Sequence, residues 1–189
     1  MIKIGILGDI GSGKSYVAKN FGYPVFNADY EVSKLYERDK KVFIKLNKVL
    51  PKYFHSFPIN KNDVLNAILD DKKNLNKIIK IVHLQIRKKL NIFLIKNKNK
   101  KIIILDIPLL LENKINKKKD VLIFVDSKKR DILKRLKKRV NFDKNILKKF
   151  KNVQFPIEYK KKKSQFIIKN DFTKKTVRES IKNILKVIL

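Results

Sequence analysis

The run IKIGILGDIGSGKSYVAKNF, residues 2–21, decides the fold of this chain. Its first part is a short apolar segment that predicts a buried strand over 2–7, and a helix is expected over 16–21. Between them, GDIGSGKS at 8–15 fits the pattern G-x-x-x-x-G-K-[ST] at every position. A strand, this loop and a helix in direct succession are typical of a phosphate-binding loop.

Each residue type in this loop has a reason to face a phosphate. Glycine lets the backbone approach a phosphate closely, and the loop N–H groups with the helix N-terminus form an anion nest. Lys14 adds a positive charge for the β- and γ-phosphates, and the Ser15 hydroxyl is the expected ligand of Mg²⁺. A glycine-rich turn with a chance Lys-Ser pair is the alternative, and the flanking strand and helix argue against it. The residues expected to bind a nucleoside triphosphate are Gly8, Gly11, Ser12, Gly13, Lys14, Ser15 and Tyr16.

Length and composition exclude several kinds of protein. The chain has 189 residues, of which 43% are hydrophobic, so it is long enough to bury a sizeable core. It has no cysteine, which excludes disulfides and thiolate metal sites, and its two histidines leave little for a histidine metal site. No apolar run reaches the roughly 18 residues that span a bilayer, and the N-terminus does not read as a signal peptide. We therefore expect a cytoplasmic enzyme with no membrane partner.

The net charge of +31 raises nucleic acid as another candidate ligand. The basic residues are 42 lysines and six arginines, and the lysines are spread along the whole chain. Proteins that read nucleic acids specifically rely on arginine forks for phosphates and bases. We expect no specific nucleic acid partner, and a basic nucleic-acid-binding protein with a phosphate loop is the least favoured alternative. The charge would still attract anionic small molecules such as nucleotides.

Strand and helix patterns alternate along the chain, which predicts an α/β fold with a parallel sheet. From 30 to 95 the pattern is mostly helical and is interrupted at Pro51 and Pro58. The four lysines at 160–163 are expected to form a solvated face. The other expected strands are 24–26, 101–107, 121–125 and 165–169, and the other expected helices are 132–150 and 176–189.

The residues after the loop narrow the class of enzyme. The helical stretch from 30 to 95 is too long for one crossover, so we expect a helical insertion beside the sheet. A GTPase should carry an N-K-x-D motif, but NKKK at 116–119 lacks the acid. A motor ATPase needs a longer core, so a small-molecule kinase is favoured.

Two acids are expected close to the loop. Asp29 follows the second expected strand and Asp106 lies in the third, and ligands of parallel sheets bind at the carboxyl ends of strands. Asp29 can accept a proton from an attacking hydroxyl or hold Mg²⁺, or it can cap the following helix. Asp106 can ligate Mg²⁺ through water or be only a polar strand end. The residues themselves leave both choices open.

Together the motifs resemble the dephospho-coenzyme A kinase family over nearly the whole chain. The loop at 8–15 resembles the family's G-G-I-G-S-G-K-S, and FNAD at 26–29 resembles I-D-A-D. HLQIR at 83–87 resembles H-P-x-[IV]-[RQ], and PLLLEN at 108–113 resembles P-L-L-x-E-N. Matches at single positions are Arg135 and Arg139 to R-x-x-x-R, and Gln154, Lys160 and Asn170 to Q-x₅-[KR]-x₉-N.

The resemblance implies a P-loop kinase with a parallel-sheet core, a helical substrate domain and a small lid. For one unit at 1–189, the nucleotide-binding core would be 1–29 and 100–189, the substrate domain 30–99 and the lid about 139–163. It also implies transfer of the γ-phosphate of ATP, with Mg²⁺, to the ribose 3′-hydroxyl of dephospho-CoA. The implied catalytic residues are Asp29 as general base, Lys14 and Arg139, and the implied substrate-binding residues are Asp29, His83, Arg87 and Glu112.

Three positions depart from the family pattern. Asn27 stands where Asp is usual, Tyr16 where Thr is usual and Leu84 where Pro is usual. An amide cannot accept a proton, but Asp29 is retained, so we expect activity to survive. Another P-loop kinase of small molecules or nucleotides is the alternative function, because the A-D pair and R-x-x-x-R could serve other acceptors.

Overall fold

The computed structural model describes residues 1–138 and 143–189, and the chain divides into two compact units. The sheet unit comprises Met1–Asn27, Asn97–Asp143 and Phe150–Leu189. The helical unit comprises Ala28–Lys96 and Lys144–Lys149. Each unit has its own packing.

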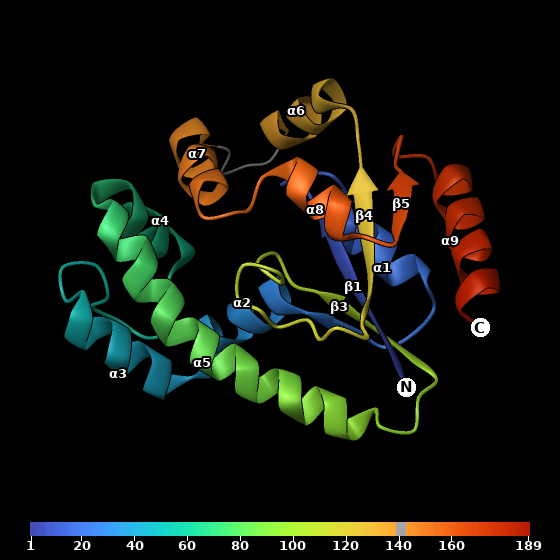
Figure 1. Ribbon diagram of the computed structural model, residues 1–189. Coiled ribbons are helices and arrows are strands. Elements are labelled where there is room, and N and C mark those ends of the chain that lie inside the picture. The colour runs from blue at the N-terminus through green and yellow to red at the C-terminus, as the bar shows by residue number, and fades with distance from the viewer. Residues whose placement is uncertain (139–142) are drawn as a thin grey trace. The chain divides into compact units, whose positions relative to one another are not determined.

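The sheet unit is built on five parallel strands in the order β2-β3-β1-β4-β5 (Figure 1). The central strand β1 pairs with β3 on one side and with β4 on the other. Because all five strands run the same way, their carboxyl ends lie along one edge, where ligands of such sheets bind. The strands are β1 (Ile2–Gly8), β2 (Val25–Asn27), β3 (Ile102–Asp106), β4 (Val121–Asp126) and β5 (Phe166–Lys169).

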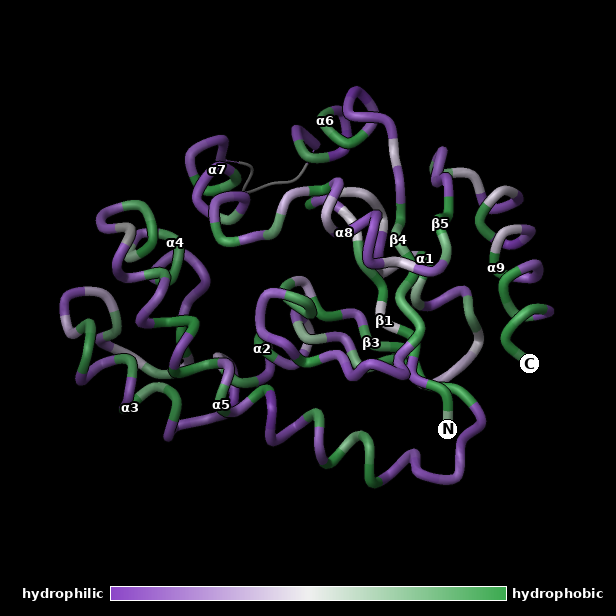
Figure 2. Tube along the Cα trace, viewed as in Figure 1, coloured by the Kyte–Doolittle hydropathy of each residue, from purple (hydrophilic) through white to green (hydrophobic). Residues whose placement is uncertain are grey.

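One face of the sheet is covered by α1 (Lys14–Asn20) and α9 (Lys174–Ile188). Alternate strand residues such as Ile4 and Ile6 enter this core, together with Val17 from α1 and Val177 from α9. Thr173 caps α9 by accepting a hydrogen bond from the backbone N–H of Thr176, and hydrophobic and polar residues alternate along this helix (Figure 2). Burial of these apolar side chains fixes both helices on the sheet.

The opposite face of the sheet is closely packed at β1. Gly5 in β1 has no room for a side chain, since a Cβ there would lie 2.4 Å from Leu110 Cδ2 and 2.9 Å from Leu122 Cδ2. The helix α8 (Ile157–Lys163) contacts β1 and β4, and the Lys161 ammonium lies over the ring of Phe124. A short helix therefore lies against the central strands of this face.

The helical unit packs three helices against α5 (Lys72–Lys96), the long helix of this unit (Figure 1). Asp39 caps α3 by accepting from Val42 N at 3.1 Å, and Asn60 caps α4 by accepting from Asn62 N at 2.9 Å. Lys149 Nζ donates to the carbonyls of Ile68 and Leu69 in the last turn of α4, at 2.5 and 2.8 Å. A cation suits the negative end of the helix dipole there. The three helices are α2 (Ala28–Arg38), α3 (Lys40–Val49) and α4 (Lys61–Asp70).

Two expectations for the basic C-terminal third were wrong. The single helix expected over 132–150 is two helices, α6 (Lys129–Lys137) and α7 (Lys144–Asn152), and Asp143, a favoured capping residue, directly precedes α7. The run at 160–163 is not a uniformly solvated face, because Lys160 is buried in α8. Charge alone could not show this, since a buried lysine depends on a partner that is distant in sequence.

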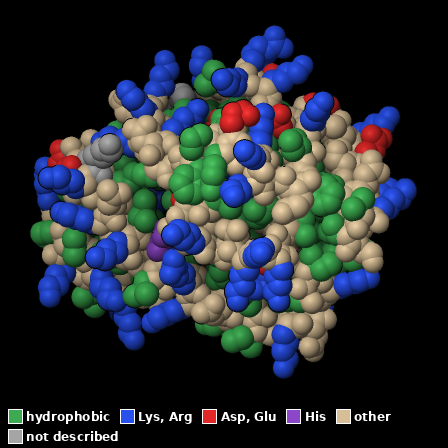
Figure 3. Space-filling view, in the orientation of Figure 1, with side chains coloured by type: hydrophobic (Ala, Val, Ile, Leu, Met, Phe, Trp, Pro, Cys, Tyr) green, Lys and Arg blue, Asp and Glu red, His purple; other side chains and the backbone are tan. Residues whose placement is uncertain are grey.

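The distribution of charged side chains on the surface does not by itself mark a binding site. Lys and Arg side chains are scattered over the face shown in Figure 3 and do not gather over one element. In the described part of the chain, no helix is both long and apolar enough to cross a membrane.

Gly5→Ala should destabilise the sheet unit, because the added methyl group would meet the buried Leu110 side chain at 2.4 Å. We expect a loss of about 1–3 kcal/mol in the free energy of unfolding, the usual cost of overpacking a core. Urea denaturation followed by circular dichroism measures this loss. Gly22→Ala is a poor control because its φ is +73°, so Ile44→Ala, at an exposed position, is the better one. A loss below about 0.5 kcal/mol for Gly5→Ala would contradict the packing described.

Candidate active site at the phosphate-binding loop

The loop between β1 and α1 has the backbone that its glycines predict. Gly11 and Gly13 have φ of 86° and 90°, angles that L side chains rarely adopt. Gly13 is the N-cap of α1, and its carbonyl accepts the backbone N–H of Val17 at 3.0 Å. The loop is closed by a hydrogen bond from Ser12 N to the Asp9 carbonyl at 3.2 Å. Its N–H groups and the positive end of α1 can therefore act together on an anion.

Lys14, the first residue of α1, folds its side chain back over the loop. Its ammonium donates to the carbonyls of Gly8 and Asp9, at 3.1 and 2.7 Å. These carbonyls orient the charge beside the loop, where a point charge can contact phosphate oxygens. Ser15 and Tyr16 follow within α1, and the side chain of Tyr16 is exposed. The sequence-predicted loop residues therefore lie together.

Residues distant in the sequence form hydrogen bonds that hold the loop in place. The Ser12 carbonyl accepts two hydrogen bonds, from Asn170 Nδ2 at 2.8 Å and from Ser127 Oγ at 2.9 Å. Asn170 is buried, and its Oδ1 accepts from Phe172 N at 2.9 Å. These bonds hold the Ser12 carbonyl on the side of the loop that faces Asn170 and Ser127. The family spacing matched Asn170 without giving it a role, whereas nothing in the sequence pattern identified Ser127.

Arg135 contacts an aromatic ring beside the loop. Its guanidinium carbon lies 4.3 Å from the centre of the Phe172 ring, a cation–π contact. Phe172 has φ of 66° and lies next to Gly13, where a Cβ would be 3.3 Å from its ring. Arg135 therefore supports the turn that packs on the loop. Arg139, the other arginine of the expected pair, lies outside the described residues.

The carboxyl ends of β2 and β3 carry a hydrogen-bonded amide and acid. Asn27 and Asp106 are register partners, and Asn27 Nδ2 donates to Asp106 Oδ2 at 2.6 Å. Asp106 is only 3% exposed, so a second carboxylate beside it would be costly, whereas the amide of Asn27 donates a hydrogen bond to it. At the position where the family pattern has an acid, this chain therefore has an amide that donates a hydrogen bond to Asp106.

The residues present fit Mg²⁺ of the kind that nucleotides bring with them. The Ser15 hydroxyl and the Asp106 carboxylate are hard oxygen donors, which Mg²⁺ prefers. Within 1–138 and 143–189, no three His, Cys, Asp or Glu side chains form a cluster that could hold a metal ion by themselves. Such a set suits an ion held by one or two protein oxygens together with substrate phosphates.

A small cavity lies behind the loop. It has a volume of about 200 Å³ and is lined by Asp9, Ser12, Asp126 and Lys161 among others. That is smaller than the roughly 300–1,000 Å³ of typical ligand pockets. Lys161 forms an ion pair with Asp126 at 3.4 Å, which closes part of the wall. This cavity alone is therefore smaller than a site that encloses a whole nucleotide would be.

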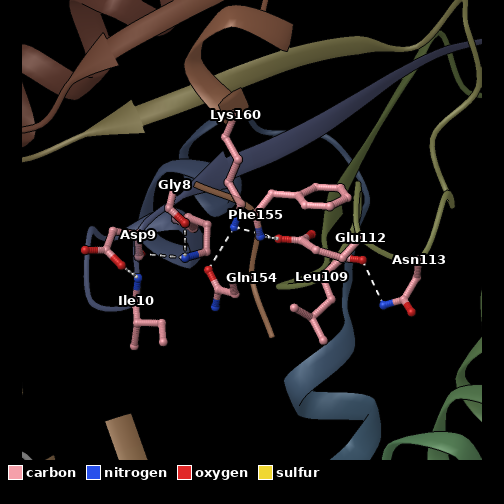
Figure 4. Close-up of polar contacts among 10 residues, drawn as sticks. Gly8, Asp9, Ile10, Leu109, Glu112, Asn113, Gln154, Phe155 and Lys160 are labelled. Atoms are coloured by element: carbon pink, nitrogen blue, oxygen red, sulfur yellow. Dashed lines mark hydrogen bonds and ion pairs between the residues drawn. The ribbon is translucent and has the colours of Figure 1, made fainter. Parts of the chain in front are cut away.

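Glu112 and Lys160 form a buried ion pair in the sheet unit, at 2.9 Å (Figure 4). The same Glu112 oxygen accepts from Phe155 N at 2.8 Å, and Lys160 Nζ also donates to Gln154 Oε1 at 2.8 Å. Glu112, which the family resemblance implies as a substrate-binding residue, is thus paired with a lysine of this chain. Its role as a substrate contact stays a prediction.

The remaining predicted residues belong to the helical unit. Asp29 lies in the first turn of α2, inside the helix and not at its cap, and its side chain is exposed. His83 and Arg87 lie on α5 four residues apart, so they share one face of that helix. His83 is partly buried, and Arg87 is exposed.

Comparison with known proteins agrees with these features. A sequence model of the dephospho-CoA kinase family matches residues 2–176. A dephospho-CoA kinase of Wolbachia from Brugia malayi is 34% identical over 187 residues, which cover 96% of this chain and 95% of the relative. The fold is similar to that of a Thermus thermophilus protein, with a TM-score of 0.77 and 23% identity over 100% of this chain and 98% of the other. It is also similar to a dephospho-CoA kinase from Campylobacter jejuni, with a TM-score of 0.64 and 22% identity over 98% and 96%.

The family model covers the loop, the Asn27–Asp106 pair and the Glu112–Lys160 pair, and the relative from Wolbachia matches this chain over nearly its whole length. A parallel sheet with a phosphate-binding loop at the end of its central strand is the fold expected of such a kinase. The chain therefore belongs to the dephospho-CoA kinase family and is an ATP-dependent kinase.

Proposed function

We propose that this chain phosphorylates the ribose 3′-hydroxyl of dephospho-CoA with the γ-phosphate of ATP, and that the loop, Asp29 and Asp106 are central to the reaction. The observation that supports this most is the loop itself, where Lys14 is held by the carbonyls of Gly8 and Asp9 beside the N-terminus of α1. A triphosphate placed there meets N–H groups, a helix dipole and an ammonium.

Positioning and electrostatics supply most of the rate in phosphoryl transfer. The loop N–H groups and Lys14 orient the γ-phosphate and stabilise charge on its oxygens. Ser15 and Asp106 would hold Mg²⁺, which when bound offsets the charge of the phosphates. The Ser12 carbonyl, tied by Asn170 and Ser127, keeps the loop from turning its carbonyls toward the anion.

Asp29 is the proposed general base. It follows Asn27, the last residue of β2, by two positions, and β2 ends at the sheet edge where β1 enters the loop. A carboxylate can accept the proton of the attacking hydroxyl as the phosphoryl group is transferred. Asn27 cannot do this, since its amide nitrogen already donates to Asp106 and an amide accepts no proton.

The other roles follow the family resemblance. His83 and Arg87 on one face of α5 would contact dephospho-CoA, and the helical unit would be its binding domain. Arg139 would neutralise charge on the phosphates in a lid. We also propose that the protein works in the cytoplasm and has no specific nucleic acid partner.

The direct test is release of ADP by the purified protein with Mg-ATP, with and without dephospho-CoA. We expect release that depends on dephospho-CoA, with CoA as the product identified by mass spectrometry. A panel of nucleosides and nucleoside monophosphates is the comparison. Faster turnover of a panel member than of dephospho-CoA would favour another small-molecule kinase.

Asp29→Asn should lower kcat by about 10²–10⁴-fold, the usual contribution of a general base. The affinity for ATP should change little, because the loop that binds phosphates is untouched. Steady-state kinetics and ATP titration measure the two effects. Asp63→Asn, in the first turn of α4 of the same unit, is the matched control and should keep wild-type turnover. Full turnover of Asp29→Asn would remove Asp29 as the base.

Asn27→Asp should cause a loss of stability, relative to wild type, that depends on pH. It brings a second carboxyl to within hydrogen-bond distance of Asp106, where Asn27 Nδ2 lies 2.6 Å from Oδ2 now. Two such carboxyls share a proton, which raises the pKa of the pair above that of an unfolded aspartate. Stability from a raised pKa is present at low pH and is lost as the pH rises through the folded-state pKa. Relative to wild type, we expect little loss at about pH 4 and about 1–3 kcal/mol at pH 8.

Urea denaturation at several pH values measures this difference. Asn27→Ala removes the donor without adding a charge, so it leaves the Asp106 carboxylate without this hydrogen bond. Its loss should also grow as the pH rises, but less steeply than that of the Asp variant, because no second charge is present. An Asn27→Asp variant whose loss is constant from about pH 4 to pH 8 would contradict the shared proton.

A further inference from the structure

The ion pair between Glu112 and Lys160 is enclosed within the sheet unit. The side chain of Lys160 is 3% exposed and that of Glu112 is 9% exposed. Glu112 Oε1 receives the Lys160 ammonium and the backbone N–H of Phe155, while Gln154 Oε1 accepts from the same ammonium. Figure 4 shows the four residues meeting at this point. The carboxylate thus ties both ends of the segment from Gln154 to Lys160 to the stretch after β3.

Such a pair is a poor source of net stability. Removing two charges from water costs several kcal/mol, and well-packed apolar residues often serve as well. Removing only one partner is strongly destabilising, because the other charge is left buried. The pair is better explained by what it positions, since a buried carboxylate with directed donors permits few alternative arrangements of the chain.

The position of this pair along the chain is informative. The boundary between the two compact units falls inside α7, between Lys149 and Phe150. Gln154 comes two residues after the end of α7 at Asn152. In the same stretch, Lys151 forms an ion pair with Asp9 of the phosphate-binding loop at 3.6 Å. The residues that directly follow the boundary between the units therefore form polar contacts within the sheet unit, through Lys151 and Gln154.

We propose that Glu112 and Lys160 are positioning residues that fix the root of α7, residues 150–152 at its C-terminal end, beside the phosphate-binding loop. On this proposal α8 belongs to the core of the sheet unit, and not to the lid that the family resemblance extends to about residue 163. α8 contacts β1 and β4, as a fixed element should. This inference rests on the proposed phosphoryl transfer.

A fixed root has a chemical consequence. During transfer, the acceptor oxygen bonds to the γ-phosphorus while the bond from that phosphorus to the oxygen of ADP breaks. Water can replace the acceptor and give ADP and inorganic phosphate, so the site must exclude water. A loosely held α7 would raise this hydrolysis relative to transfer. Glu112 acts here through Lys160 and Phe155, which differs from direct contact with dephospho-CoA.

The test compares ADP released with CoA formed, in variants that either break the pair or replace it. The key protein is the double variant Glu112→Gln, Lys160→Met, which leaves no unpaired buried charge and should keep its fold. We expect its ratio of ADP to CoA to rise about tenfold, with acceptor-free hydrolysis rising in parallel. Lys160→Arg keeps the pair and should retain a wild-type ratio, and Lys162→Met, at an exposed position of α8, should not change it. Thermal unfolding checks the fold of every variant.

Three results separate the explanations. A folded double variant with a wild-type ratio and wild-type hydrolysis would overturn the proposal and leave the pair a packing feature. A higher KM for dephospho-CoA in Glu112→Gln alone, with Lys160→Met unchanged, would also overturn it, since Glu112 would then contact substrate. If the wild-type protein formed no CoA at all, the proposed acceptor would be refuted, and hydrolysis without acceptor would still test the positioning role.

Discussion

Gly13 has no room for a side chain, because a Cβ there would lie 2.5 Å from Asn170 Nδ2. That close approach lets Asn170 reach the Ser12 carbonyl, and the same asparagine receives the N–H of Phe172. The phosphate-binding loop is therefore shaped by the segment that follows β5 as well as by its own glycines. The hydrophobic core packs β5 and α9 against the sheet. Because Asn170 directly follows β5, this packing also fixes the position of the phosphate-binding loop.

Local patterns predicted much of this structure. The strand–loop–helix at the N-terminus, the parallel sheet and the helical stretch after β2 follow from apolar runs, glycine positions and helical spacing, which depend on neighbours in sequence. The burial of Lys160 and the hydrogen bond from Asn27 to Asp106 do not, because each depends on a partner brought close only by the fold. The two helices in place of one over 132–150 show the same limit, since apolar spacing alone does not mark where a helix stops.

Several of the abundant lysines have individual structural roles. Lys14 spans the loop, Lys149 meets the last carbonyls of α4, Lys151 pairs with Asp9 and Lys160 pairs with Glu112. These contacts differ in chemistry: they are hydrogen bonds to loop carbonyls, hydrogen bonds at the end of a helix, and exposed and buried ion pairs. A net charge of +31 is therefore compatible with a kinase whose ligand is a nucleotide.

Asn27 stands where the family pattern has an aspartate, and this difference bears on which residue can act as the general base. An amide and a carboxylate have nearly the same shape, so the contact with Asp106 survives, but only the carboxylate can take up a proton. If the family reaction needed a base at this position, this chain would lack it, although it retains the loop, Asp29 and the Glu112–Lys160 pair. A chain that keeps the whole surrounding apparatus and replaces one acid by its isosteric amide favours Asp29 as the proton acceptor. Asn27 then has the separate task of holding the Asp106 carboxylate through the hydrogen bond from its amide nitrogen.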